Sequence, residues 1–182
     1  MLHTFVVYVD NKPGVLNRVA SLFRRRAFNI ESLTVGHTEQ AGLSRITVVV
    51  DTDGYGARRL EAHLYKLVPV KRVDDITSVA SIVRDLALIK VAATGDARAQ
   101  VMQLVDVYRA RVVDVGPESL VIETTGTEDK IDSLLDVLRP YGLLEMVRTG
   151  RVAMARGNNR AARPSEPLSG DLIADDVSNF SV

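Results

Sequence analysis

The chain has 182 residues, 46% of them hydrophobic, which is enough for one medium domain or two small ones with a real core. Its 23 basic and 23 acidic residues balance, which argues against a strong field that attracts nucleic acid or an anionic membrane. The absence of cysteine excludes disulfide bonds, thiolate catalysis and cysteine metal sites.

Targeting and membrane signals are missing from the sequence. No apolar run approaches the roughly 18–20 residues that a membrane-spanning helix needs. The first residues, Met1–Thr4, lead directly into a predicted strand and do not resemble a secretory signal peptide. We therefore expect a soluble protein in the cytoplasm.

The stretch Val9–Val35 is predicted to contain the end of a strand, a turn, a helix and a second strand. The β-branched and aromatic run Phe5–Val9 predicts the first strand. Apolar residues at helical spacing predict a helix over about Gly14–Arg26. Pro13 suits the first helical position, where its missing N–H is no loss, and Gly14 lacks a Cβ, so another molecule can approach the backbone there.

The start of this helix is a plausible seat for a small anion such as a carboxylate. Its first N–H groups have no partner inside the helix and lie at the positive end of the helix dipole. These residues alone favour an ordinary strand-to-helix turn over an anion site. At the other end, Arg24, Arg25 and Arg26 suit the negative end of the dipole, and a phosphate or partner contact is the alternative.

The remaining elements of the first half follow from alternation, helical spacing and turn residues. Asp51–Gly54 superficially resembles a calcium loop but lacks its later ligands, so it predicts a turn and a helix cap. The predicted elements are the strand Phe28–Gly36, the hairpin loop Glu39–Gly42, the strand Leu43–Asp51, a helix marked by Leu60, Leu64 and Leu67 and stopped by Pro69, and the strand Val70–Ile76.

The same order of elements then repeats. The second set is the strand Asp85–Ala93, the helix Ala97–Ala110, the strands Val112–Val115 and Leu120–Thr125 around Gly116–Glu118, a helix capped by Thr127, and the strand Leu143–Val147 with an optional extension at Val152–Ala155. Only the first half has the Pro-Gly turn and Asn11, whereas the second half has Thr94–Asp96 at that place. A ligand of these turns is therefore expected in the first half.

Two βαββαβ units predict an α+β protein of two consecutive ferredoxin-like domains, at residues 1–78 and 79–156. Such a unit covers one face of its sheet with helices, so we expect homodimerisation through the sheets. The composition changes to Asn, Arg, Pro, Ser and Gly in residues 157–182, which predicts a disordered tail. A weak docking peptide near Leu172–Phe180 is the alternative for the end of that tail.

Residue sets for catalysis are not apparent. The three histidines, His3, His37 and His63, lack metal-ligand spacing, and no nucleotide-binding glycine motif occurs. Asp74 and Asp75 are neighbours in a predicted strand, so their side chains point to opposite faces. The aromatic residues of an RNA-binding sheet are absent. We predict no catalytic and no metal-binding residues; a small ferredoxin-like enzyme is a competing hypothesis.

The segment DNKPGVLNRVASLFRRRAFNIESLTVG resembles the N-terminal ACT domain of the small, regulatory subunits of acetohydroxyacid (acetolactate) synthase. NIESL is specific to that family, while Pro-Gly-x-Leu marks ACT domains in general. The likeness covers about residues 2–157 and continues in LSRITVVV, HLYKLVPVKRV, DLALIKV, VVDVGPESLVIETTGTEDKIDSLL and RTGRVAMARG.

The resemblance implies a non-catalytic homodimer in branched-chain amino-acid biosynthesis. Such dimers bind the large catalytic subunit, raise its activity and confer feedback inhibition by valine. Thiamine diphosphate, Mg and FAD are then expected on the catalytic subunit, and no cofactor, nucleic acid or membrane partner on this chain. Leucine and isoleucine stay open as effectors. A stand-alone double-ACT amino-acid sensor, acting on another enzyme or on transcription, is the main alternative.

The resemblance also implies that valine lies between two N-terminal ACT domains. The matching positions are Asn11, Gly14, Val15 and Leu16 of one chain and Asn29 and Ile30 of the other. The amides of the three residues after Pro13 suit the carboxylate, the two asparagines and nearby carbonyls suit the ammonium group, and Ile30 suits the isopropyl group. Asn29 is equally typical of a turn that leaves a helix.

One position departs from the family pattern. The family usually has glycine where this chain has Ala27, in the turn after the first helix. If this position needs a positive φ, alanine costs about 1 kcal/mol there.

Overall fold

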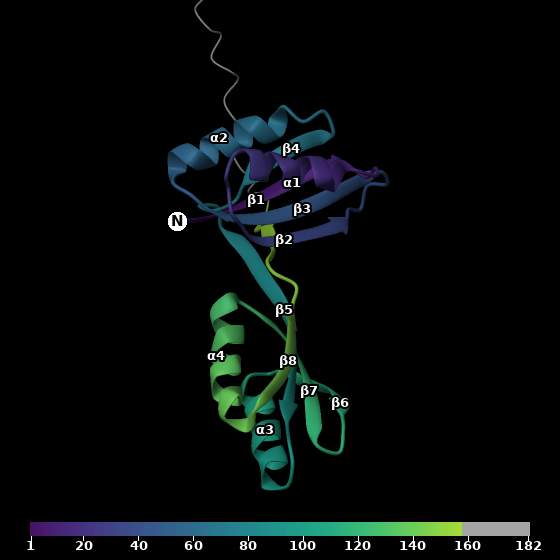
Figure 1. The fold of residues 1–182 in the computed structure, drawn as a ribbon, viewed down its shortest axis with the longest axis vertical. Coiled ribbons are helices and arrows are strands. Elements are labelled where there is room, and N and C mark those ends of the chain that lie inside the picture. The colour runs from purple at the N-terminus through teal and green to yellow at the C-terminus, as the bar shows by residue number, and fades with distance from the viewer. Residues whose placement is uncertain (158–182) are drawn as a thin grey trace, which may run out of the picture.

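The computed structural model of the chain describes residues 1–157, so the predicted tail from residue 158 onward and its docking peptide lie outside the described residues. Within residues 1–157 the chain forms two βαββαβ units, each an antiparallel sheet with two helices on one face (Figure 1). The predicted fold class, two consecutive ferredoxin-like units, is confirmed. No helix in this part of the chain has the length and apolar character needed to cross a membrane.

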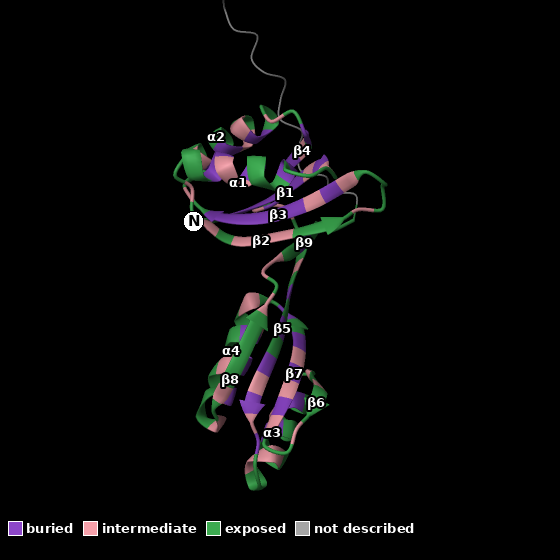
Figure 2. Ribbon diagram, turned by 45° about the vertical axis from the view of Figure 1, so that its right-hand side comes forward, coloured by how far each residue is buried: buried purple, intermediate pink, exposed green. Residues whose placement is uncertain are grey.

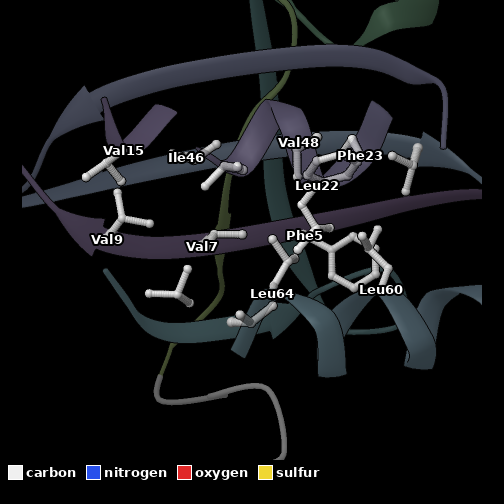
Figure 3. Packing of buried hydrophobic residues seen from close by; sticks show 14 of the residues in the cluster. Phe5, Val7, Val9, Val15, Leu22, Phe23, Ile46, Val48, Leu60 and Leu64 are labelled. Atoms are coloured by element: carbon white, nitrogen blue, oxygen red, sulfur yellow. The ribbon is translucent and has the colours of Figure 1, made fainter. Parts of the chain in front are cut away.

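The first unit contains a four-stranded sheet in the order β2-β3-β1-β4. Its elements are β1 (Leu2–Asp10), α1 (Val15–Arg25), β2 (Ile30–His37), β3 (Leu43–Asp51), α2 (Gly54–Tyr65) and β4 (Val70–Asp75). Because side chains alternate along a strand, every second residue of β1 and β3 faces the two helices. The resulting core includes the fully buried rings of Phe5 and Phe23 (Figure 3).

The second unit contains strands in the order β6-β7-β5-β8, and β9 pairs with the first part of β5. Its elements are β5 (Ser81–Ala92), α3 (Asp96–Val107), β6 (Arg111–Val115), β7 (Ser119–Gly126), α4 (Glu128–Leu138), a short 3-10 helix (Arg139–Tyr141), β8 (Leu143–Arg148) and β9 (Val152–Ala155). Its core is separate from that of the first unit and contains Ile89, Ile122 and Leu134.

Several element boundaries differ from the predictions. Helix α1 begins at Val15, and Pro13 lies in the turn before it, because Gly14 adopts a φ of 80° that an α-helix does not accommodate. Strand β5 begins at Ser81, ahead of the predicted Asp85, because its first residues pair with β9. Strand β9 therefore returns to β5 and is not an extension of β8.

Two predicted helix caps have different outcomes. The Asp53 carboxylate accepts a hydrogen bond from the Gly56 amide at 2.6 Å and caps α2, as predicted. Thr127 occupies the N-cap of α4, but its side chain makes no cap hydrogen bond. The acidic residues Glu128 and Asp129 lie in the first turn of that helix, where the dipole favours them.

The two units share one contact surface near β9. The predicted boundary at residues 78 and 79 lies in the turn between β4 and β5. Ala153 of β9, however, packs under the first sheet against Val6 and Ile76. The division into domains at residues 1–78 and 79–156 therefore stays a prediction.

Helices α1 and α3 end in the same left-handed turn. At the end of α1, the Phe28 amide donates to the Phe23 carbonyl at 3.0 Å, and Ala27 has a φ of 57°. At the end of α3, the Ala110 amide donates to Val105 at 2.9 Å, around Arg109 with a φ of 52°. Both are Schellman motifs, which favour glycine at the residue with positive φ. Ala27 thus meets the condition under which alanine is costly.

Replacing Ala27 by glycine should raise the free energy of unfolding by about 1 kcal/mol, because glycine adopts a positive φ without a steric cost. Chemical denaturation followed by circular dichroism measures the change. Ala20→Gly, within α1, is the matched control and should lower the stability by about 1 kcal/mol. Equal losses in the two variants would show that Ala27 is not strained.

Candidate ligand-binding site

Backbone hydrogen bonds stabilise the turn between β1 and α1. The Asn11 amide donates to the Gly42 carbonyl of the neighbouring hairpin at 2.8 Å, and the Lys12 amide donates to Asp10 at 3.0 Å. The side-chain Nδ2 of Asn11 lies 3.4 Å from Nδ1 of His37, at the end of β2. These contacts join the turn to the edge strand of the sheet and leave Asn11 exposed.

The first amides of α1 differ in their availability. Those of Gly14 and Leu16 have no hydrogen-bond acceptor among the described residues, whereas the Val15 amide donates to the Lys12 carbonyl at 3.3 Å. The Val15 side chain is buried in the core, while Leu16 is 43% exposed. The amides of Gly14 and Leu16 are therefore available as donors at the positive end of α1, and an anion there would compete with Lys12 for the Val15 amide.

Asn29 and Ile30 follow the left-handed turn at the other end of α1. Asn29 is exposed, and its Nδ2 donates to the carboxylate of Glu31. Ile30 is half-buried against the core, and the pairing of β2 with β3 shifts between Ile30 and Ser32. This irregularity is a β-bulge, and bulges commonly re-aim side chains next to functional sites.

A single chain does not bring the six predicted residues together. Asn11, Gly14, Val15 and Leu16 lie at one end of α1 and β2, and Asn29 and Ile30 lie at the opposite end (Figure 1). A helix of 11 residues is about 16 Å long, which separates the two groups. Within one chain the predicted site is therefore divided into two partial sites, which lie at opposite ends of the edge strand β2.

The second unit closes the equivalent turn with a side chain of its own. The guanidinium of Arg98, on α3, donates to the carbonyls of Ala93, Gly116 and Pro117 at 3.2 Å or less. These carbonyls belong to the end of β5 and to the hairpin between β6 and β7. This arrangement agrees with the expectation that a ligand of such turns binds in the first unit.

One polar row was not apparent from the sequence. Arg45 and Arg72 flank Tyr8 on the open face of the first sheet, with guanidinium carbons 5.7 and 5.4 Å from the ring centroid. The row borders a hollow of about 520 Å³. Arg45 also donates to the Ala153 carbonyl, which ties β9 to the first sheet. The row arises only when three strands pair in register, so no local sequence motif predicts it.

The basic end of α1 lies beside the end of α2. Arg25 and Arg26 line a groove of about 260 Å³ together with His63 and Lys66. The groove agrees with a partner contact at the arginine triplet, but that contact stays a prediction. Among residues 1–157, no group of acidic residues and histidines has the arrangement of a metal site.

Two family models match the chain, one in each unit. Residues 5–72 match the family model described as the AHAS small subunit-like ACT domain, and residues 84–157 match that of the small subunit of acetolactate synthase. A probable acetolactate synthase small subunit of Archaeoglobus fulgidus is 50% identical over 160 residues, which cover 88% of this chain and 100% of the relative. The acetolactate synthase small subunit of Bacillus subtilis is 43% identical over 170 residues, 93% of this chain and 99% of the relative.

A solved structure agrees with these matches. The crystal structure of the acetolactate synthase small subunit from Thermotoga maritima has a TM-score of 0.81 and 38% sequence identity. The match covers 87% of this chain and 99% of that chain. The similarity therefore extends over both units and the junction between them.

Replacing Gly14 by alanine should lower the free energy of unfolding by about 1 kcal/mol through backbone strain alone. An added Cβ at Gly14 meets no atom within 4 Å, but the φ of 80° disfavours any L side chain. Gly36→Ala is the matched control, since its Cβ also meets open space at an ordinary φ. A thermal denaturation series should show a loss for Gly14→Ala only; two equal changes would contradict the strain.

Proposed function

The chain belongs to the family of acetolactate synthase small subunits, and we propose that it is a non-catalytic regulatory subunit that activates the catalytic subunit and makes it sensitive to valine. The observation that carries the effector part is the Gly14 turn. It presents two free amides at the positive end of a helix, next to the edge strand of the first sheet.

Valine has chemistry that suits the two partial sites. Its carboxylate fits the amides of Gly14 and Leu16, and its ammonium group fits the side-chain oxygens of Asn11 and Asn29. The half-buried Ile30 offers an apolar wall for the isopropyl group. Leucine and isoleucine share the first two features, so the size of the apolar wall in the assembled site selects among them.

A homodimer supplies the missing half of each site. Strand β2 is an edge strand, and two such edges pair antiparallel about a two-fold axis. This pairing brings the Ile30 end of one β2 to the His37 end of its partner, where Asn11 lies. Val35, on β2, is 46% exposed in the single chain and becomes covered in such a dimer.

Feedback inhibition follows from a ligand that two chains hold together. Valine stabilises the dimer arrangement that closes its site, and it shifts the population of regulatory dimers toward that arrangement. A tenfold change in the ratio of two states needs only about 1.4 kcal/mol of differential binding. The chemistry takes place on the catalytic subunit, for which we propose thiamine diphosphate, Mg and FAD as cofactors.

Acetolactate formation by the purified catalytic subunit, with and without the full chain and across an L-valine titration, tests the proposal. We expect stimulation by the chain and reversal of that stimulation by valine. Stimulation without a valine response would refute the effector role and point to the strained Ala27 turn. Absence of stimulation would refute the partner and favour a double-ACT sensor of another enzyme.

Replacing Gly14 by aspartate should abolish inhibition by valine while activation remains, because the new carboxylate repels the carboxylate of the ligand. The same activity assay, together with calorimetric titration of valine, measures both effects. Gly14→Ala serves as the control, since it adds backbone strain without charge. Loss of activation in Gly14→Asp, with activation retained in Gly14→Ala, would show that sensing and activation share one surface.

A further inference from the structure

A return segment, Thr149–Ala155, links the end of the second unit to the first sheet. It leaves β8 and enters β9, which pairs with residues Ser81 to Arg84 of β5 (Figures 1 and 2). At its start, the Thr149 amide donates to the Leu86 carbonyl at 3.0 Å, which anchors the segment to the second unit. Its middle, around Arg151, then contacts the edge strand β2.

The backbone of Arg151 is bound on both sides by β2. Its amide donates to Oγ of Ser32 at 2.9 Å, and its carbonyl accepts from Oγ1 of Thr34 at 2.6 Å. Ser32 and Thr34 are two residues apart on a strand and share one face. Gly150 makes the close approach feasible, since a Cβ there would lie 2.4 Å from Oγ of Ser32.

The side chain of Arg151 reaches the second unit. Its Nη2 and Nε donate to the same carboxylate oxygen of Glu128, at 2.6 and 3.2 Å. Its Nη1 donates to Oγ1 of Thr4, on β1, at 3.3 Å. Glu128 is the first residue of α4, and the hydrogen bonds from Arg151 lower the pKa of its carboxyl group. One residue therefore contacts β1, β2 and α4.

The junction around Arg151 is polar and not fully packed. A cavity of about 230 Å³ lies there, lined by Glu31, Glu128, Arg148 and Arg151 among others. Arg148 pairs with Asp85 at 2.8 Å and with Asp132 at 2.9 Å, but its buried Nη2 has no partner among the described residues. The contacts around this cavity are therefore polar, whereas the apolar contact between the two units lies at Ala153.

Strand β2 connects this junction to the proposed effector site. It begins at Ile30, and the side chain of Asn29 donates to Glu31, which lines the junction cavity. Ser32 and Thr34, which hold Arg151, follow on the same strand. Only a few residues of β2 therefore separate Asn29 and Ile30 from the contacts of Arg151.

We propose that Arg151 is a positioning residue that couples the effector site on β2 to helix α4 of the second unit. This inference rests on the proposed function and assigns a route to it. When valine orders the start of β2, Ser32 and Thr34 hold the backbone of Arg151, and its guanidinium carries the position of β2 to Glu128. The coupling is a free energy between two sites, and inhibition is its kinetic readout. A variant can therefore bind valine and still lose inhibition.

The test uses the holoenzyme assembled with the full chain carrying Arg151→Met, which keeps the backbone contacts and removes the guanidinium. Valine affinity is measured by calorimetry, and activation and maximal inhibition by acetolactate formation. We expect affinity within about threefold of the unsubstituted chain, intact activation, and a loss of at least about tenfold in the coupling between valine binding and inhibition. Full inhibition of this variant would overturn the proposal.

Arg111→Met is the matched control. Arg111 also pairs with a glutamate, Glu123, but both residues lie on neighbouring strands of the second unit. This variant should retain inhibition by valine. Equal losses of inhibition in both variants would overturn the coupling role and indicate a general effect of removing an ion pair.

A second variant guards against misfolding of the first. Glu128→Gln removes the charge from the other side of the contact. The double variant, Arg151→Met with Glu128→Gln, should lose no more inhibition than Arg151→Met alone, because the contact with Glu128 is already lost in that variant. Additive losses would overturn the proposal. Absence of valine binding by the unsubstituted chain would refute the proposed function itself, whereas binding with full inhibition in Arg151→Met refutes only the coupling.

Discussion

Each unit of this protein covers one face of an antiparallel sheet with two helices and leaves the other face and the edge strands uncovered. Unpaired strand edges, and apolar residues on an open sheet face, are unfavourable in water and need partners. The first unit meets part of this need within the chain, because Ala153 packs beneath its open face against Val6 and Ile76. Its edge strand β2 contacts the return segment through Ser32 and Thr34, and we propose that a second chain pairs with its edge.

The two similar units differ at their strand-to-helix turns. Both contain a strand-to-helix turn with a glycine of positive φ, Gly14 in the first and Gly95 in the second. In the second unit the side chain of Arg98 binds the carbonyls around its turn. In the first unit the turn keeps free amides, at the edge where another chain is proposed to pair. The two units thus share a fold and differ at this turn, and we propose the sensing role for the first unit only.

The proposed coupling between the two units uses contacts that are individually weak. Hydrogen bonds between side chains and backbone contribute about 0.5–1.5 kcal/mol each, which is the scale of typical allosteric coupling. Arg151 combines several of them across three elements, and the cavity beside it leaves the units room to move. The apolar contact of Ala153 with Val6 and Ile76 lies apart from this cavity, so the contacts of Arg151 are the polar part of the junction.

Most of the fold was accessible from local sequence patterns. The strand Leu43–Asp51 was predicted with its observed boundaries, because alternation and flanking turn residues are local signals. The segment Asp51–Gly54 predicted a helix cap, which Asp53 forms. Alanine in place of the family's usual glycine at position 27 indicated a turn that is strained if its φ is positive. The start of α1 was misplaced by one residue, since the sequence does not report that Gly14 has a φ of 80°.

The sequence by itself determined the two βαββαβ units, the turn at Gly14 and the family resemblance, since periodicity, turn chemistry and motifs act over short distances along the chain. Only the tertiary structure decided that β9 pairs with β5, that Arg98 occupies the second turn and that Arg151 joins β2 to α4. Ser32 and Arg151 are 119 residues apart in the chain, and their contact depends on sheet register and on the packing of two units. No local pattern encodes such a pair, because its energy arises only when both units are folded.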